Sequence, residues 1–336
     1  MGRGYWSADD YAATTKKKVD SGTTFGYDRY ARSTRTFEPH ENLDPFKVVN
    51  SVGVIESRDN PEHPNSVPIV IGLDQTGSMG SVPRVIQTKL KEVFSLLNLR
   101  GYIEDPQISI AAYGDTHADP IRTAVQISAF ESDNRIDDNL DNLLLYGGGG
   151  GNNGETMTGI WYMMSKVESD AWEKRMKKGY AFFVADEVAL DLTAEQVKGF
   201  CGDNQPTAPL KVKELAENMK ETWEVFILLV NNRAAKNQRS EKFYTDLFGI
   251  DHVLVLEDPD VIAETITLTI GVNEGTVDLD EGEADLRKTG ANEVAIRSAS
   301  DALRNAGLDR LTGRGQVVRG GTLDIGNTGP STTVRL

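Results

Sequence analysis

One short stretch places three oxygen-bearing side chains directly after an apolar segment. Residues 67–73 read VPIVIGL, and Asp74, Thr76 and Ser78 follow in the sequence DQTGS. A carboxylate and two hydroxyls at a spacing of two suit Mg²⁺ or Mn²⁺, which prefer oxygen ligands at about 2.0–2.1 Å. The same residues could instead do no more than cap the helix that follows. Taken alone, the stretch leaves both interpretations open.

A second pair of carboxylates follows a second apolar segment. Residues 180–185 read YAFFVA, and Asp186 and Glu187 come next. In an open α/β sheet, ligands bind beyond the carboxyl ends of the strands. We therefore expect Asp74 and Asp186 to lie on the same rim of one sheet.

A glycine-rich loop lies between these two segments. Residues 146–160 read YGGGGGNNGETMTGI, and five consecutive glycines let a backbone come very close to its neighbours. Asn152, Asn153, Glu155 and Thr156 then supply oxygens just before a predicted helix. No Gly-Lys-Ser/Thr follows, so this is not a Walker phosphate loop. Three oxygen-rich loops together favour a metal site over simple helix caps.

Apolar patterns predict the elements that must hold these loops. Short apolar runs indicate strands at 68–73, 108–113, 123–130, 180–185, 225–230 and 252–256. Apolar residues at steps of three and four indicate helices at 82–97, 157–167, 212–223 and 261–270. Buried strands that alternate with amphipathic helices predict an α/β fold, doubly wound, with a mostly parallel Rossmann-like sheet and helices on both faces.

The chain divides into three predicted parts. Residues 1–66 form an extended arm that packs on the core or on a partner, because aromatic residues are too frequent there for a free linker. Residues 67–271 form the α/β domain. Residues 272–336 form a C-terminal extension with one helix, at about 291–306, and a flexible tail.

Composition narrows the classes of partner. The chain has 336 residues and a net charge of −15, which disfavours nucleic acid because phosphate binding needs an excess of Lys and Arg. No apolar run approaches the roughly 18 residues of a membrane span. A single cysteine permits no internal disulfide and fits a reducing, cytoplasmic location. The sequence leaves the oligomeric state open.

The three loops together resemble the von Willebrand factor A (vWA) domain over residues 67–271. The resemblance implies a metal-ion-dependent adhesion site (MIDAS), in which one divalent cation is held by D-x-S-x-S, a Thr of a second loop and an Asp of a third. The family pattern falls on Asp74, Thr76 and Ser78 in the first loop and on Asp186 in the third. Thr76 replaces the usual Ser, and both carry a hydroxyl.

The middle loop is aligned here with the Gly-Gly-Gly-Asp-x-Pro-Glu loop of intracellular vWA proteins, rather than with the family's usual G-x-T-x-T. Asn152 then takes the Asp position and Glu155 the Glu position. Among Asn153, Glu155 and Thr156 we favour Thr156 as the metal ligand, with Glu155 second. The residues expected to surround the ligands are Asp115, Asn152, Asn153 and Glu187, although Asp115 could equally be an ordinary turn residue.

Two further stretches resemble a group of vWA proteins from bacteria and their phages. They are ESRDNPEHPNS at 56–66 and ISAFESDNR at 127–135. Soluble bacterial vWA proteins often work beside AAA ATPases or in stress and phage-defence systems, which the resemblance offers as possible partners.

The leading hypothesis is a metal-dependent protein-binding module or scaffold that is not an enzyme. In the family, an exposed Asp or Glu of the partner completes the coordination of the cation. One alternative is a phosphohydrolase, because DQTGS also resembles the Asp-Lys-Thr-Gly-Thr loop of haloacid-dehalogenase-like enzymes. Asp74 would then be the nucleophile and Asp186 a Mg²⁺ ligand, but Gln75 stands in place of the lysine. A structural subunit of a larger assembly is the other alternative.

Overall fold

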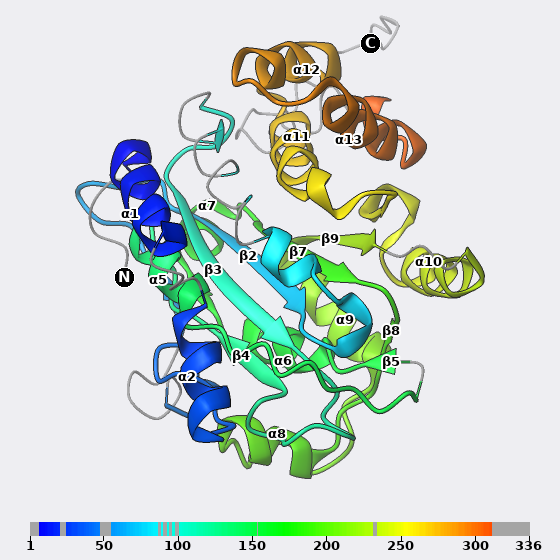
Figure 1. The fold of residues 1–336 in the computed structure, drawn as a ribbon. Coiled ribbons are helices and arrows are strands. Elements are labelled where there is room, and N and C mark those ends of the chain that lie inside the picture. Colours follow the sequence, from blue (N-terminus) through cyan, green and yellow to red (C-terminus); the bar gives the residue numbers. More distant parts are fainter. Residues whose placement is uncertain are drawn as a thin grey trace, which may run out of the picture.

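A six-stranded sheet forms the centre of the fold in the computed structural model (Figure 1). The structure describes residues 7–20, 25–47, 55–86, 89, 93, 96–97, 101–152, 154–230 and 234–310. The strands of the sheet are β2 (Val67–Asp74), β3 (Pro106–Tyr113), β4 (Val125–Ile127), β7 (Gly179–Ala185), β9 (Trp223–Val230) and β10 (Val253–Leu256). Their order is β10-β9-β7-β2-β3-β4, and only the β3–β4 pair is antiparallel. This confirms the predicted doubly wound α/β fold with a mostly parallel sheet.

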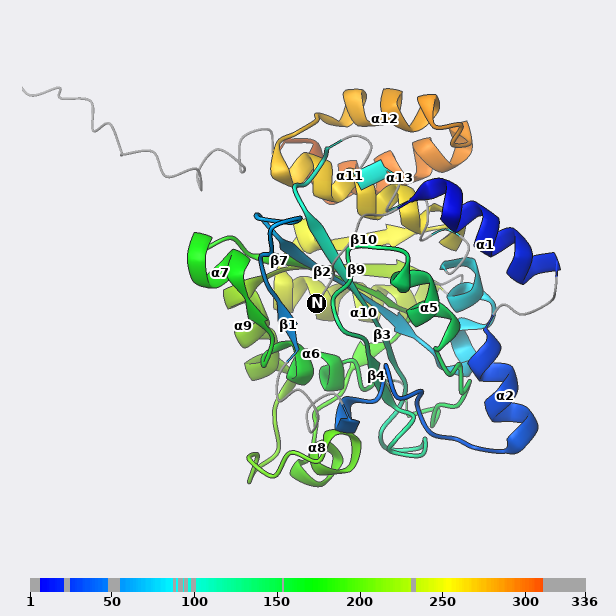
Figure 2. The same ribbon diagram turned by 90° about the vertical axis from the view of Figure 1, so that its left-hand side faces the viewer.

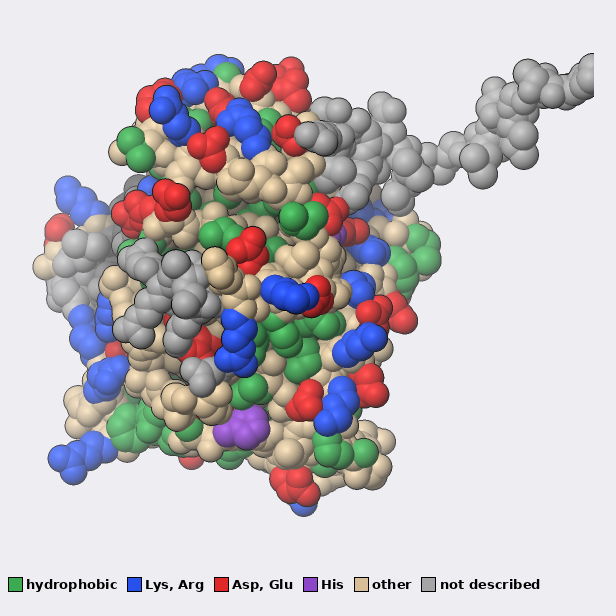
Figure 3. All heavy atoms as spheres, turned by 90° about the vertical axis from the view of Figure 1, so that its right-hand side faces the viewer, with side chains coloured by type: hydrophobic (Ala, Val, Ile, Leu, Met, Phe, Trp, Pro, Cys, Tyr) green, Lys and Arg blue, Asp and Glu red, His purple; other side chains and the backbone are tan. Residues whose placement is uncertain are grey.

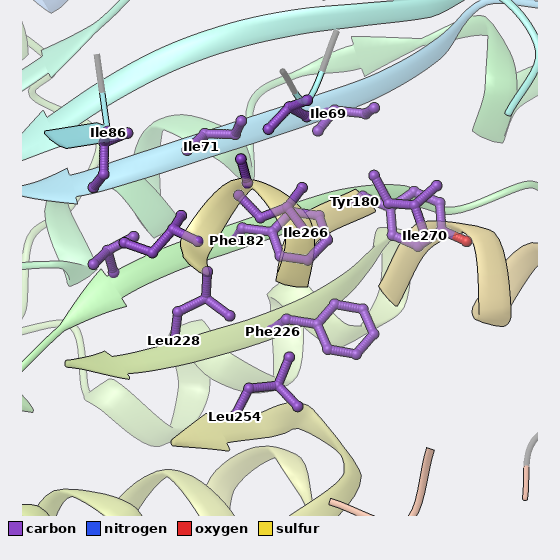
Figure 4. Close-up of a cluster of buried hydrophobic side chains, with 14 of the residues drawn as sticks. Ile69, Ile71, Ile86, Tyr180, Phe182, Phe226, Leu228, Leu254, Ile266 and Ile270 are labelled. Atoms are coloured by element: carbon purple, nitrogen blue, oxygen red, sulfur yellow. The ribbon is translucent and has the colours of Figure 1, made fainter. Parts of the chain in front are cut away.

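Alternate side chains of the central strands point to opposite faces of the sheet and pack into two separate cores. Ile69 and Ile71 of β2 lie in one core with Phe182 and Phe226 of the neighbouring strands (Figure 4). Val70, between the two isoleucines, lies in the other core. Both faces of each central strand are buried, which explains why these strands are continuous apolar runs in the sequence.

Helices cover both faces (Figures 1 and 2). The first core includes residues of α5 (Arg135–Asp141), α11 (Ile262–Glu274), α12 (Leu279–Lys288) and α13 (Glu293–Asn305). The second includes residues of α6 (Thr158–Met164), α8 (Ala194–Cys201), α9 (Val212–Thr222) and α10 (Ala234–Phe248). The helix predicted at 82–97 is described at 82–86, 89, 93 and 96–97, and those residues are helical. In the part of the chain that the structure describes, no helix is both long and apolar enough to cross a membrane.

The N-terminal arm packs on the domain, but it is not extended throughout. It contains α1 (Ala8–Asp20) and α2 (Gly26–Thr34), and Phe25 and Leu43 are buried in the first core. The short strand β1 (Glu56–Ser57) pairs in parallel with β6 (Glu168–Ser169). Strand β6 is followed directly by α7 (Asp170–Arg175). Several of the arm's aromatic side chains nevertheless stay in solvent: Tyr30, Phe37 and Phe46 are 56%, 41% and 42% exposed.

The C-terminal extension differs from the prediction in two ways. It has two helices in its described part, α12 and α13, where one was expected. The acidic stretch that precedes the predicted helix is α12, whose start is fixed by a capping box between Asp278 and Glu281. The expected boundary at 271 also falls inside α11, which continues until Gly275 ends it with a left-handed φ of 66°.

Candidate metal site

The three oxygen-rich loops meet at the carboxyl end of the sheet. Strands β2 and β7 are neighbours, with Leu73 paired to Val184, so Asp74, the last residue of β2, and Asp186, the residue after β7, lie at the ends of adjacent strands. The middle loop joins them through a two-stranded sheet of β5 (Gly154–Glu155) and β8 (Val188–Ala189). From β2 the strand order runs in two directions, to β3 on one side and to β7 on the other. Open α/β sheets bind ligands at the carboxyl ends of the strands at such a switch point.

Asp74 is fully buried and only half satisfied. Its Oδ1 accepts hydrogen bonds from the Thr76 backbone N–H at 2.8 Å and from the Thr76 hydroxyl at 2.6 Å. Its Oδ2 is buried and accepts no hydrogen bond from any described residue. A buried carboxylate oxygen without a donor is costly unless a cation or a proton satisfies it.

The environment of Asp74 acts against its negative charge. Burial raises its pKa well above the usual value, and the neighbouring charge of Asp186 raises it further. Asp186 is itself almost fully buried. The loop that carries it is fixed from α10, because the Ser240 hydroxyl donates to the Asp186 carbonyl and the Tyr244 hydroxyl to the Glu187 carbonyl. Two buried carboxylates thus lie close enough for the charge of one to raise the pKa of the other, and a divalent cation would favour the ionised form of both.

The hydroxyls of the first loop lead from this buried position to the surface. The Thr76 Oγ1 lies 3.0 Å from the Ser78 Oγ. Thr76 is buried, whereas Ser78 is exposed. The structure therefore brings Asp74, Thr76 and Ser78 into one connected set of oxygens, as the spacing predicts.

Thr156 is the middle-loop hydroxyl with the best-fixed position. It is fully buried, its N–H donates to the Gly114 carbonyl at 2.9 Å, and its Oγ1 accepts from the Thr116 N–H at 2.9 Å. The sequence analysis aligned this loop with another motif and not with the family's G-x-T-x-T. That alignment was wrong, because Gly154, Thr156 and Thr158 match G-x-T-x-T. Thr158 Oγ1 donates to the Leu190 carbonyl and so anchors the start of α6.

Glu155 sits beside the same acidic groups. It is buried, and its Oε2 accepts no hydrogen bond from the described residues. Burial raises its pKa to about 10, helped in turn by the charges of Asp74, Asp115, Glu187 and Asp186. Asp74 has a pKa raised by the same causes, so this shift does not separate Glu155 from Thr156, and Thr156 stays the favoured prediction.

Asp115 holds the glycine loop. Its Oδ2 accepts hydrogen bonds from the Gly150 N–H at 3.1 Å and from the Asn152 amide at 2.9 Å. Its Oδ1 accepts from the His117 N–H at 2.8 Å. With both oxygens engaged, Asp115 positions the loop. Its bond from the His117 N–H is also that of an ordinary turn residue, the alternative given above, and its place around a cation stays a prediction.

Asp119 also holds the glycine loop, at Gly149, and the sequence analysis did not identify it. Its Oδ1 accepts the Gly149 N–H at 2.8 Å. A Cβ on Gly148 would lie 1.9 Å from that oxygen, so a residue with a side chain does not fit there without a shift. The loop in turn lies against the first loop, because the Gly77 N–H donates to the Gly148 carbonyl at 2.9 Å. Gly148 thus leaves the space that the Asp119 carboxylate occupies.

The other predicted surrounding residues have mixed outcomes. Asn152 contacts Asp115, as described above. Glu187 contributes its carbonyl to the Tyr244 contact, and its charge raises the pKa of Glu155. Asn153 lies outside the described residues.

A divalent cation bound at these groups would have few carboxylate ligands. No group of three or more His, Cys, Asp or Glu side chains in the described ranges is arranged to hold a metal ion. A cation here would therefore depend on two carboxylates, Asp74 and Asp186, together with the hydroxyls of Thr76, Ser78 and Thr156. Such an oxygen-only set suits Mg²⁺ or Mn²⁺.

Comparisons with known proteins leave the family of this chain open. No protein-family model matches the chain, and no curated protein matches it. Its fold is similar to solved structures at low identity, one of which is the pilus adhesin SpaC of Lactobacillus rhamnosus GG. That match has 12% identity and a TM-score of 0.45, and it covers 62% of this chain and 31% of the adhesin. Proximal thread matrix protein 1 of the mussel byssus has 9% identity and a TM-score of 0.40, with coverage of 60% and 47%. The chain thus spans less than half the length of either.

Proposed function

We propose that this chain is a vWA-like protein-binding module whose site at the end of β2 holds Mg²⁺ or Mn²⁺. The observation that carries the proposal is the buried Asp74, with one oxygen fixed by Thr76 and the other without a donor, next to a second buried carboxylate. A cation would satisfy that oxygen and neutralise the repulsion with Asp186. The ligands would be Asp74, Thr76, Ser78, Thr156 and Asp186.

The proposed role of the cation is to attract a partner's carboxylate. If Asp74 and Asp186 hold the ion mainly through waters and the neutral hydroxyls contact it directly, a bound divalent ion would keep much of its attraction for a further carboxylate. Ser78 is exposed, so the solvent side of the site is open to an incoming group. An exposed Asp or Glu of a partner protein is the expected ligand. An AAA ATPase or a component of a stress or phage-defence system stays a prediction from the resemblance, and a cytoplasmic location stays a prediction from the composition.

The phosphohydrolase alternative has less support. In that mechanism a lysine would follow the nucleophilic aspartate, and Gln75 stands there instead. The Gln75 side chain is buried and turned towards the β4 side of the sheet, where its Oε1 accepts from the Gln126 amide at 2.9 Å. It is therefore not available to a substrate phosphate. A structural role in a larger assembly is compatible with the same cation site.

Calorimetric titration of the EDTA-stripped protein with MnCl₂ or MgCl₂ tests the proposal. The wild type should bind a single cation, and Asp74→Ala should abolish the binding heat. Asp246→Ala is the matched control, because Asp246 is an exposed residue of α10 that only pairs with Lys242. Equal binding by the wild type and Asp74→Ala would rule out this site.

A further inference from the structure

A groove lies against α10, on the side of the molecule that Figure 3 shows. It has a volume of about 570 Å³ and is lined by residues of β8 and the loop after it, the start of α9, and one side of α10. This volume is within the range that takes one or two large side chains of a ligand. Leu190, Val212, Phe243 and Leu247 give it an apolar lining.

Two walls of the groove are bonded to the site itself. The Leu190 N–H donates to the Glu155 carbonyl at 2.9 Å, one residue before Thr156. On the opposite side, Thr116 donates its N–H to Thr156 Oγ1, and the next residue, His117, lines the groove. Hydrogen bonds therefore link two parts of the groove's lining to Glu155 and Thr156 of the middle loop.

The charged residues at the groove favour an acidic ligand. Lys211 and Lys213 lie at its edge, and both are exposed. Lys211 pairs with Asp191 at 2.9 Å, whereas Lys213 has no ion pair among the described residues. Because Asp191 balances the charge of Lys211, Lys213 is the lysine that leaves a positive charge at the edge of the groove, and the proposed cation would add to it.

We propose that the groove is a docking surface for an extended, acidic segment of a partner protein. One Asp or Glu of the segment would complete the coordination of the cation, and a large apolar side chain a few residues away would enter the groove. The proposal rests on the proposed cation site for the first of these contacts. The apolar contact and the contact with the lysines depend only on the groove and not on the cation.

The test uses fluorescein-labelled synthetic peptides and the full chain. Each peptide is Glu-rich and carries one Asp and one Phe at a varied separation, with Asp→Asn and Phe→Ala counterparts. Binding is followed by fluorescence anisotropy in Mg²⁺ and in EDTA. At least one separation should bind in Mg²⁺, and the affinity should fall about tenfold or more for the Phe→Ala peptide.

Two variants of the protein report on the groove. Leu247→Ala and Lys213→Glu should each weaken the same peptide severalfold, whereas Lys198→Glu on α8 should not, because Lys198 is exposed and does not line the groove. Circular dichroism of each variant checks that the fold is retained.

The outcomes separate the two proposals. Binding that is lost in EDTA but indifferent to Phe→Ala, Leu247→Ala and Lys213→Glu would overturn the groove and leave the cation site. Binding that depends on Phe and Lys213 but not on Mg²⁺ would uphold the groove and overturn the cation site. No binding of any peptide in either buffer would overturn the groove proposal.

Discussion

The carboxylate of Asp28, in the N-terminal helix α2, accepts the backbone N–H of Leu145 at 3.2 Å, although the two residues are 117 positions apart. Leu145 comes just before the glycine loop. Arg84, in the helix after the first loop, lies 3.5 Å from the same carboxylate, and Arg32 of α2 lies 3.0 Å from it. One buried carboxylate thus ties the arm to two of the three loops of the proposed site.

Asp28→Asn should therefore weaken both the fold and cation binding. Asparagine keeps the shape but loses the charge that faces the two arginines, and removing one partner of a buried charge-assisted contact costs about 1–3 kcal/mol. We expect a lower free energy of unfolding in urea and a severalfold weaker affinity for Mn²⁺ by calorimetry. Arg29→Gln, at an exposed position of the same helix, is the control. An unchanged Mn²⁺ affinity in Asp28→Asn would show that the arm does not position the loops.

Gly148→Ala tests the close packing of the glycine loop. The new Cβ would collide with Asp119, whose carboxylate holds the Gly149 N–H. Relief of the collision would displace the loop, and we expect a loss of about 1–3 kcal/mol of stability. Gly26→Ala is the control, because a Cβ at Gly26 meets nothing within 4 Å. Equal melting temperatures for the two variants would contradict this account of the loop.

Thr76 separates the role of the hydroxyl from that of side-chain volume. Thr76→Val keeps the shape but removes the oxygen that donates to Asp74 at 2.6 Å. We expect it to lower Mn²⁺ affinity at least tenfold, which corresponds to about 1.4 kcal/mol. Thr76→Ser keeps the hydroxyl and should bind nearly as well as the wild type. Calorimetry on both variants decides the matter, and similar affinities would remove Thr76 from the ligand set.

The raised pKa of Glu155 predicts the pH dependence of the cation-free protein. At a pKa of about 10, the folded state keeps a proton that an unfolded glutamate releases near pH 4.3. Stability from this group is full at low pH and is lost as pH rises towards 10, by at most about 1.4 kcal/mol per pH unit. The raised pKa of Asp74 acts in the same direction.

Urea unfolding in EDTA across the range from about pH 5 to about pH 9 measures this slope. Glu155→Gln should flatten it, whereas Glu241→Gln, at an exposed position on α10, should leave it unchanged. Cation binding should instead strengthen as pH rises, because metal and proton compete for the carboxylates. A wild-type stability that does not fall with pH in EDTA would contradict the assignment of a protonated Glu155.

The loops of the site could be predicted from sequence because each one follows its own local signal. Asp74 and Asp186 end buried apolar runs, and the ends of parallel strands share one rim. Helix α12 also had a local signal, since Asp278 and Glu281 stand at capping-box spacing, but its acidic composition masked it. Thr156 was favoured as a ligand, but the family spacing that it shares with Gly154 and Thr158 was overlooked.

The contacts that hold the site could not be predicted in the same way. Asp28 and Leu145 share no local pattern, and only the fold brings them together. In the sequence, Asp119 looks like an ordinary turn residue. It holds the Gly149 N–H only because the fold brings the glycine loop next to it. The antiparallel direction of β4 likewise depends on the connection to β3, and an apolar run does not encode strand direction.

The melting temperature with and without cation tests the central claim most directly. A ligand at a hundred times its dissociation constant stabilises a fold by about 2.7 kcal/mol. For a domain of this size each kcal/mol moves the melting temperature by roughly 2–4 °C. Saturating Mg²⁺ or Mn²⁺ should therefore raise the melting temperature of the EDTA-stripped wild type by about 5–10 °C.

Asp74→Ala should abolish this rise without lowering the melting temperature of the cation-free protein, because the substitution also removes the repulsion between Asp74 and Asp186. A wild type whose melting temperature is the same in EDTA and in saturating Mg²⁺ or Mn²⁺ would contradict the account, and Asp74, Thr76 and Ser78 would then be only a turn that leads into a helix.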